Sequence, residues 1–248
     1  MKVELLEIGQ VKEDDLRFAV ISALFKDKWI FVKHKERDTL EIPGGHREIG
    51  EDINATAKRE LFEETGAKTF KIEPICDYSV TRDDESSYGR LFYAEIKDLG
   101  DLPDLEIGKV ELFNKLPEKL TYPDIQPFLH NRALREKIKR EYFGKKVKVV
   151  MDRPLGSKHK KHGFIYPINY GYLPNTISGD GEEIDAYILG EFEPLKSYEG
   201  YVAAIIHRKN DNEDKLVVCR ELDVYNKDQI KALTEFQERF FESEIIMY

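Results

Sequence analysis

One stretch of the chain, residues 45–67, constrains its fold more strongly than any other part of the sequence. It reads GHREIGEDINATAKRELFEETGA and fits the spacing G-x5-E-x7-R-E-U-x-E-E-x-G-U, where U is an aliphatic or small apolar residue. Glu48 and Glu51 would lie at the start of a helix, where negative charge is favourable, and Gly66 follows its last turn, where glycine is common. The pattern predicts a helix over residues 52–65 that follows a glycine-containing loop.

Three glutamates of this helix fall on one of its faces. Glu60, Glu63 and Glu64 are three and four residues apart, the spacing at which helical side chains are neighbours. Their charges repel one another unless cations neutralise them, and clustered carboxylate oxygens suit Mg²⁺ or Mn²⁺. Arg59 lies four residues before Glu63 and is expected to orient it. The sequence therefore predicts a divalent metal site on this face.

An exposed amphipathic helix rich in glutamate is the alternative interpretation of the same charges. The glycines that flank the helix favour the metal site, because Gly44 and Gly45 would let the backbone approach a bound metal closely. With all of its fixed positions matched, the stretch is identified as a Nudix box. The resemblance implies membership of a family that hydrolyses a nucleoside diphosphate linked to another group.

The resemblance also implies a role for each matched position. The metals would polarise the diphosphate and activate the attacking water. The general base would be a glutamate of the box or a carboxylate on a later loop, for which Glu106 and Glu111 are candidates. Glu60 and Glu64 would be the principal metal ligands, Glu63 a further ligand or support, the Gly44 carbonyl a completing ligand, and Glu51 and Arg59 the residues that brace the loop and helix.

The order of the expected elements predicts two domains. A charged helical pattern over residues 125–143 ends at Gly144, and we place the boundary there, with domains at 1–143 and 144–248. Residues 133–143 fit either a closing helix of the first domain or a stiff linker. In the first domain the helix lies among expected strands, which fits an α/β/α Nudix sandwich; the strands are 18–25, 29–33, 70–79, 88–96 and around 110–113.

The second half has a signature of its own in residues 164–190, FIYPINYGYLPNTISGDGEEIDAYILG. Asp180, Glu182 and Asp185 can converge on one cation cluster, because a glycine separates the first two and the third begins a strand. The segment resembles soluble family I inorganic pyrophosphatases, in which three such acidic residues hold Mg²⁺ ions. The resemblance implies a small β-barrel with one C-terminal helix, here over residues 227–242.

This second resemblance is uneven. The matching residues are Tyr166 and Tyr170 (active-site tyrosines), Lys148 and Lys215 (phosphate-binding lysines) and Asp211, Glu213 and Asp214 (a second acidic cluster). The glutamate expected after Lys148 is Val150, the segment of the usual arginine is shortened so that only Arg153 could substitute for it, and no lysine lies at residues 240–242. The alternative is therefore a non-catalytic binding or dimerisation module, which would make a homodimer.

The basic stretch 153–162 fits a phosphate-binding loop or a solvated turn, and His159 and His162 alone are not expected to bind a metal.

The composition limits the partners. A formal net charge of −9 and a pI near 5.4 argue against a nucleic acid duplex, which normally needs a basic face. Cys76 and Cys219 form no metal-binding or redox pair and are expected to be buried free thiols. No segment approaches a transmembrane length and the first residues lack the apolar core of a signal peptide, so a cytoplasmic location is expected.

The residues around the box suggest a substrate. The layout WIFVKHKERDTLEIPGGH before the helix and DYSV after it resembles bacterial MutT-type 8-oxo-dGTP diphosphatases. That resemblance implies cleavage of an oxidised nucleoside triphosphate to the monophosphate and pyrophosphate, which the second domain would bind or hydrolyse. ADP-ribose or a related dinucleotide is the alternative substrate.

Overall fold

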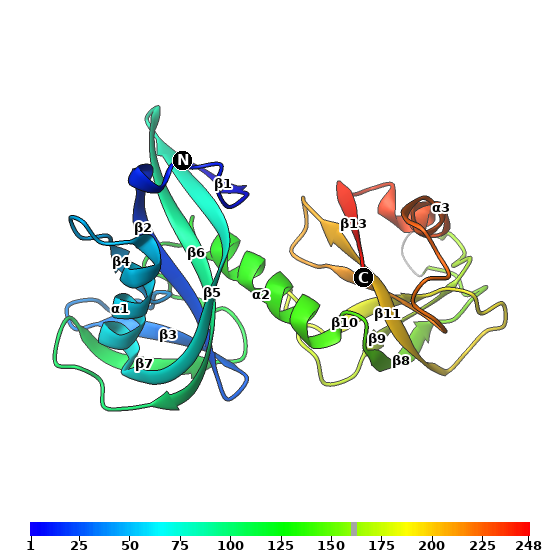
Figure 1. The fold of residues 1–248 in the computed structure, drawn as a ribbon. Helices are drawn as coiled ribbons and strands as arrows, with labels where there is room; N and C mark the ends of the chain where they lie inside the picture. Colours follow the sequence, from blue (N-terminus) through cyan, green and yellow to red (C-terminus); the bar gives the residue numbers. More distant parts are fainter. Residues whose placement is uncertain (160–162) are drawn as a thin grey trace. The chain divides into compact units, whose positions relative to one another are not determined.

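The structure, a computed structural model, describes residues 1–159 and 163–248. The chain divides into two compact units, Met1–Glu136 and Lys137–Tyr248, and each is described by itself (Figure 1). The change from one unit to the other falls within a single helix, α2 (Gln126–Tyr142). The predicted domain boundary after residue 143, close to the end of this helix, stays a prediction.

The first unit contains a mixed sheet in the order β1-β5-β6-β2-β3-β7, with β4 paired to β2. Strands β2 and β6 run parallel, and the other pairs are antiparallel. The strands are β1 (Lys2–Leu6), β2 (Leu16–Phe25), β3 (Lys28–His34), β4 (Gly44–His46), β5 (Ala67–Arg82), β6 (Glu85–Leu99) and β7 (Ile107–Phe113), and a short 3₁₀ turn (Glu13–Asp15) precedes β2.

Two hairpins of this sheet turn through two-residue loops. Lys26 and Asp27 join β2 to β3, and Asp83 and Asp84 join β5 to β6; all four have positive φ angles, between 48° and 66°. Positive φ at both loop positions is the geometry that suits the twist of a two-residue hairpin. The β5–β6 hairpin extends well beyond the predicted strands 70–79 and 88–96.

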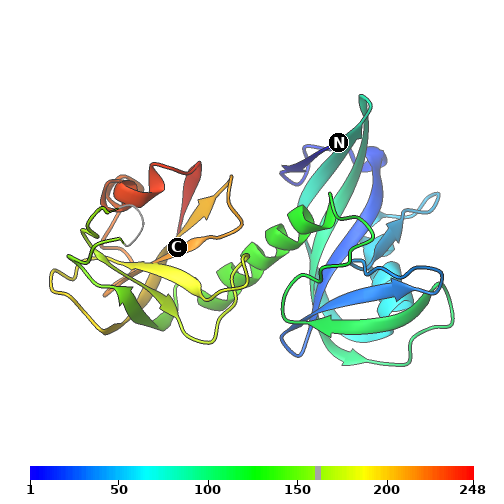
Figure 2. The same cartoon turned by 180° about the vertical axis from the view of Figure 1, so that it is seen from behind.

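Helices cover both faces of the first sheet. Helix α1 (Ile53–Thr65) buries Ala57 and Leu61 in the core on one face. On the other face the His130 ring of α2 lies 4.9 Å from the ring of Trp29 and 5.8 Å from that of Phe31. The ribbons of α1 and α2 accordingly lie on opposite sides of this sheet (Figures 1 and 2). The predicted α/β/α sandwich is confirmed.

The second unit is a small β-barrel. Its sheet has the order β12-β10-β9-β8-β11-β13, and an additional pairing between β11 and β12 closes five of the strands into a ring. The elements are β8 (Lys146–Arg153), β9 (Asn169–Leu173), β10 (Ile184–Ile188), β11 (Ser197–Arg208), β12 (Lys215–Cys219), α3 (Lys227–Glu238) and β13 (Ser243–Met247). This confirms the predicted barrel with its C-terminal helix.

The C-terminal helix is shorter than predicted. Helix α3 ends at Glu238, whereas the sequence predicted residue 242. Its last turn tightens, with the Phe241 N–H donating to the Glu238 carbonyl, and the Glu242 carbonyl then accepts from the Lys209 N–H beside β11 at 2.7 Å. Pairing with β11 therefore replaces the last helical turn.

Both cysteines, Cys76 and Cys219, are free and buried, as predicted. Within residues 1–159 and 163–248, no helix combines the length and the apolar character needed to cross a membrane.

Candidate functional site

Helix α1 is fixed at both ends by its own sequence. The Asp52 carboxylate accepts hydrogen bonds from the Asn54 and Ala55 N–H groups, at 2.9 and 3.2 Å, and so caps the start. Gly66, with a φ of 72°, ends the helix in the left-handed conformation that favours glycine. The box glutamates are therefore carried on a helix of fixed register.

The glycine loop predicted before α1 contains Gly44 and Gly45, which the structure places in the short strand β4, and it packs too closely for any side chain. A Cβ on Gly44 would lie 2.8 Å from the Cα of Val20, and a Cβ on Gly45 would lie 2.7 Å from one carboxylate oxygen of Glu60 and closer to the other. The loop therefore lies directly against β2 and against the carboxylate of Glu60, which explains the two glycines physically.

Arg59 joins three carboxylates of the box. Its guanidinium donates to both oxygens of Glu51 at 2.9 and 3.0 Å, to Glu60 at 2.8 Å and to Glu63 at 3.0 Å. The hydrogen bonds from Arg59, followed by one from Thr56, lower the pKa of Glu51 to about 2. The sequence correctly placed Arg59 within reach of Glu63, and the structure adds the contacts with Glu51 and Glu60.

Glu64 lies apart from this arginine. Its carboxylate accepts a hydrogen bond from the Gly44 N–H at 2.8 Å. Burial raises the pKa of Glu64 to about 8, and the charges of Glu60, Glu41 and Glu106 act in the same direction. The contact that the structure shows for Gly44 is through its N–H, so the predicted ligand role of its carbonyl stays a prediction.

The donor set suits a divalent cation chemically. In the described part of the chain, no three His, Cys, Asp or Glu side chains are close enough together to enclose a metal ion. Glu60 and Glu64 are nevertheless hard oxygen donors, and burial raises the pKa of each because the ionised carboxylates would have an excess of uncompensated negative charge there. A divalent cation would relieve that excess, so the residues present fit the group.

The two candidate general bases, Glu111 in β7 and Glu106 just before it, differ in their position relative to the box. Glu111 pairs with Phe31 across β3 and β7, and Phe31 packs against α2, so Glu111 points away from α1. Glu106 lies close enough for its charge to act on Glu64, and one of its carboxylate oxygens lies 3.8 Å from Nε2 of His34. Of the two, only Glu106 shares the side of the box carboxylates.

Glu41 is a residue that the sequence analysis missed. Its backbone forms a bridge with Val32, and directly opposed residues in such a bridge point to the same face, here the face that α1 covers. Its charge acts on Glu64. The available signal was its position as the single acidic residue of the LEIPGG segment, but only the bridge to β3 shows which way it points.

In the second unit, the partly exposed Asp185 lies at the centre of a cluster with the buried Tyr170 and Lys215. The Tyr170 hydroxyl donates to its carboxylate, and Nζ of Lys215 lies 2.7 Å from the same oxygen. Lys215, whose side chain is 2% exposed, also forms an ion pair with Glu213. Tyr166 adjoins the cluster, with its ring 5.6 Å from that of Tyr170.

The other residues predicted for this site have other hydrogen-bond or ion-pair partners or are exposed. Asp180 accepts hydrogen bonds from the Ser178 hydroxyl at 2.6 Å and from the N–H of Glu182, whose side chain is exposed. Lys148 is exposed, and the strand register places it on the sheet face of Asp185, two strands away. Asp211 and Asp214 pair with Arg208 and His207 instead, at 3.2 and 2.9 Å.

Part of the basic stretch 153–162 can be located. The His159 ring stacks on Phe164, with the ring centroids 4.8 Å apart, whereas His162 lies outside the described residues.

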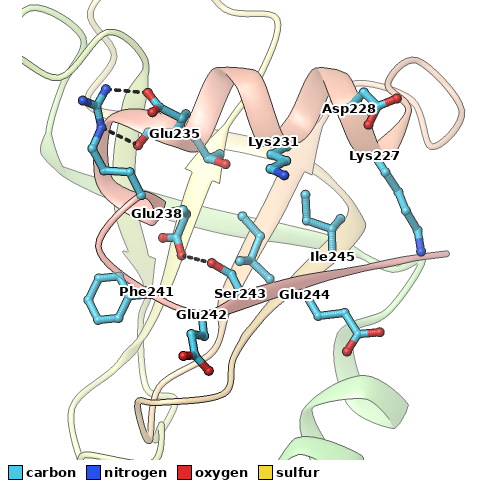
Figure 3. Close-up of a pocket in the computed structure, with 13 residues that line it drawn as sticks. Lys227, Asp228, Lys231, Glu235, Glu238, Phe241, Glu242, Ser243, Glu244 and Ile245 are labelled. Atoms are coloured by element: carbon cyan, nitrogen blue, oxygen red, sulfur yellow. Dashed lines mark hydrogen bonds and ion pairs between the residues drawn. The ribbon is translucent and has the colours of Figure 1, made fainter.

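A cavity of about 570 Å³ lies between α3 and β13 (Figure 3). Its lining includes Glu238 and Arg239 but neither Asp185 nor Lys215, so it is separate from the acidic cluster.

Comparison with known families agrees with the division of the chain into two units. The model of the NUDIX domain matches residues 15–124. A Bacillus subtilis protein described as "Putative 8-oxo-dGTP diphosphatase YtkD" is 30% identical over 120 residues, which cover 48% of this chain and 75% of that protein. The chain belongs to the Nudix family. Its first unit is the Nudix unit, which acts on phosphoric anhydrides.

The second unit of this Nudix protein matches another family. The model of inorganic pyrophosphatase covers residues 132–246. The inorganic pyrophosphatase of Neisseria meningitidis is 28% identical over 114 residues, 38% of this chain and 64% of that enzyme. The chain thus spans less than two thirds of this relative. The protein is a Nudix hydrolase fused to a pyrophosphatase-like unit, and both families generally use divalent metal ions.

Solved structures resemble each unit of the Nudix protein. The Bacillus subtilis pyrophosphohydrolase BsRppH is 26% identical, with a TM-score of 0.47 over 54% of this chain and 90% of that one. The inorganic pyrophosphatase of Ehrlichia chaffeensis is 14% identical, with a TM-score of 0.36 over 43% of this chain and 88% of that one.

Proposed function

We propose that the Nudix unit hydrolyses a nucleoside triphosphate to the monophosphate and pyrophosphate, with 8-oxo-dGTP as the best candidate substrate and Mg²⁺ as the metal. The observation that carries the proposal is the placement of Glu60 and Glu64 beside the closely packed glycine loop. The name of the Bacillus subtilis relative supports the choice of substrate. Such a reaction requires hard oxygen ligands for Mg²⁺ near the substrate phosphates.

The residues of α1 have two different roles, metal binding and the positioning of the carboxylates. Glu60 and Glu64 would hold the metal, which when bound polarises a phosphoryl oxygen and acidifies a water. Arg59 fixes Glu60 and Glu63 and ties both to Glu51 at the entrance of the helix. Because these contacts exist before substrate arrives, the carboxylates need little rearrangement during the reaction.

A panel of substrates tests this proposal. Wild-type protein and Glu64→Gln are assayed with 8-oxo-dGTP, dGTP and ADP-ribose, with and without Mg²⁺. We expect Mg²⁺-dependent formation of 8-oxo-dGMP from 8-oxo-dGTP and a loss of at least about 100-fold in Glu64→Gln, since a metal contributes several kcal/mol to such a reaction. A preference for ADP-ribose would mean that the substrate is ADP-ribose or a related dinucleotide and not a nucleoside triphosphate. Full activity in Glu64→Gln would show that the proposed metal site on α1 is wrong.

For the second unit we propose that it binds or hydrolyses the pyrophosphate that the Nudix unit releases. Supporting observations are the cluster of Asp185, Tyr170 and Lys215 and the match to the pyrophosphatase family. Hydrolysis of the product would make the first reaction effectively irreversible, which gives the fusion a chemical purpose.

A specific observation favours binding without hydrolysis as a second candidate. Lys215 already forms ion pairs with Asp185 and Glu213, so a metal ion at these carboxylates would have to displace the buried ammonium group of Lys215. Val150, on the same face, contributes no carboxylate. To separate the two candidates, pyrophosphate hydrolysis and calorimetric binding are measured on the full chain carrying Glu64→Gln, with and without Asp185→Asn. Phosphate release that depends on Asp185 supports hydrolysis, and binding without release supports the second candidate.

A further inference from the structure

An arginine near the Nudix box has a fixed position that none of the box residues explains. Arg37 lies in the loop between β3 and the glycine loop, and its Nη1 donates to both oxygens of Glu41, at 3.1 and 3.3 Å. The Glu41 side chain is 12% exposed, whereas that of Arg37 is 43% exposed. The pair therefore combines a nearly buried carboxylate with a guanidinium that solvent, and a ligand, can reach.

The backbone holds Glu41 on two sides. Its N–H and carbonyl exchange hydrogen bonds with Val32 of β3, both at 2.9 Å. Next to it, the Leu40 N–H donates to the Lys119 carbonyl at 2.9 Å, and the Leu40 carbonyl accepts from the Thr121 N–H at 2.8 Å. Segment 39–41 is thus hydrogen-bonded to β3 on one side and to residues 119–121 on the other. The Glu41 carboxylate, which orients Arg37, therefore has little freedom to move.

This carboxylate faces the box. Glu41 shares with Val32 the side of the sheet that α1 covers, and Glu64 is hydrogen-bonded to Gly44, three residues after Glu41. The charge of Glu41, followed by a hydrogen bond with Tyr122, raises the pKa of Arg37, so the guanidinium remains cationic.

We propose that Arg37 binds a phosphate group of the nucleotide substrate at the rim of the box, and that Glu41 is the positioning residue that holds the guanidinium there. This inference rests on the proposed function, because it concerns the same substrate. A triphosphate carries more negative charge than bound metal alone neutralises, and a guanidinium presents several N–H donors in a plane that matches phosphate oxygens. Arg59, by contrast, uses its guanidinium on Glu51, Glu60 and Glu63.

The test measures kcat and KM for 8-oxo-dGTP hydrolysis in Arg37→Ala, Arg37→Lys and Glu41→Gln. Loss of a charge-assisted hydrogen bond to phosphate predicts that KM rises about 10- to 100-fold in Arg37→Ala, with a smaller change in kcat. Arg37→Lys keeps the charge and should recover part of the loss. Glu41→Gln should raise KM less than Arg37→Ala does, since the arginine remains but is less well oriented.

Two further measurements separate phosphate binding from a merely structural ion pair. Ethylguanidinium added to Arg37→Ala should lower its KM towards that of the wild type. Arg82→Ala, which removes an exposed arginine at the tip of the β5–β6 hairpin, is the matched control and should leave KM unchanged.

The proposal is overturned if Arg37→Ala keeps KM within about twofold of wild type while the wild type is active. It is also overturned if Arg37→Ala only lowers the melting temperature and kcat, which is the result for a loop contact. A wild type without activity towards any nucleotide would instead reject the proposed function itself, so the two failures are distinguishable.

Discussion

Gly45 sets how closely the backbone approaches the carboxylates of α1. Because a Cβ at this position would lie within 2.7 Å of Oε2 of Glu60, Gly45→Ala must displace either the loop or the glutamate. A displacement of about 1 Å at a catalytic centre costs on the order of 100-fold in rate, so we expect kcat to fall by about that factor.

The matched control for Gly45→Ala is Gly108→Ala in β7, whose nearest neighbour would be the flexible side chain of Lys35 at 3.2 Å. The two variants are compared by kcat for 8-oxo-dGTP and by thermal unfolding. An unchanged kcat in Gly45→Ala would show that the close packing against Glu60 has no part in the reaction.

His130 gives the Nudix unit a predictable response to pH. Burial against Trp29 and Phe31 lowers its pKa from 6.5 to about 4. The unfolded chain therefore takes up the proton first as the pH falls, and stability is lost from about pH 6.5 down to about pH 4. Between pH 7 and pH 5 this group alone should cost about 2 kcal/mol of unfolding free energy.

The measurement for His130 is urea unfolding at pH 7 and pH 5, followed by the fluorescence of Trp29, the single tryptophan. His130→Phe removes the titrating group, so its loss of stability between the two pH values should be about 2 kcal/mol smaller than that of wild type. An equal loss in both proteins would mean that other groups cause the acid sensitivity.

At the scale of single residues, the sequence predicted the helix of the box and the contact between Arg59 and Glu63 because both depend on local spacing. Helical periodicity places Glu60, Glu63 and Glu64 near one another and Arg59 near Glu63 without any tertiary information. The direction of Glu41 could not be predicted in this way, because it depends on a bridge to β3 that is formed between separate segments. Contacts of this kind carry no signal in one sequence.

Helix α3 is held on the barrel by a buried ion pair. Arg208 of β11 contacts both carboxylate oxygens of Glu238 at 2.6 and 3.0 Å, and the Tyr187 hydroxyl donates to the same carboxylate at 2.6 Å. Glu238→Ala leaves the Arg208 charge buried without this partner, so we expect the second unit to lose about 3 kcal/mol of stability.

The chain offers an internal control for Glu238→Ala. The single tryptophan, Trp29, reports unfolding of the Nudix unit, while circular dichroism reports both units. The variant should shift a transition seen by circular dichroism and leave the Trp29 fluorescence transition in place. No shift in either signal would show that the pair contributes little to α3 docking.

At the scale of elements, the strong periodic patterns were predicted and the short edge elements were not. Strand β13 (SEIIM) was missed because its residues follow directly from a helical pattern, and only pairing with β11 makes them a strand. The β5–β6 hairpin was predicted too short because its tip turns through Asp83 and Asp84 without a glycine, although their positive φ angles suit a two-residue loop.

At the scale of the whole molecule, two folds associated with phosphoric anhydrides occur in one chain. The sequence predicted both, because each carries a motif with fixed spacing. It could not show that Lys215 pairs with Asp185, since this contact brings together strands β10 and β12. The arrangement of this cluster therefore depends on packing that no motif describes.

The most direct test of the account is the full product balance of the Nudix reaction. Wild type and Glu64→Gln are incubated with 8-oxo-dGTP and Mg²⁺, and 8-oxo-dGMP, pyrophosphate and phosphate are quantified in the same samples. We predict one monophosphate for each pyrophosphate, counting two phosphates as one pyrophosphate, and a rate at least about 100-fold lower in Glu64→Gln. Formation of 8-oxo-dGDP with single phosphates, or an undiminished rate in Glu64→Gln, would contradict the account.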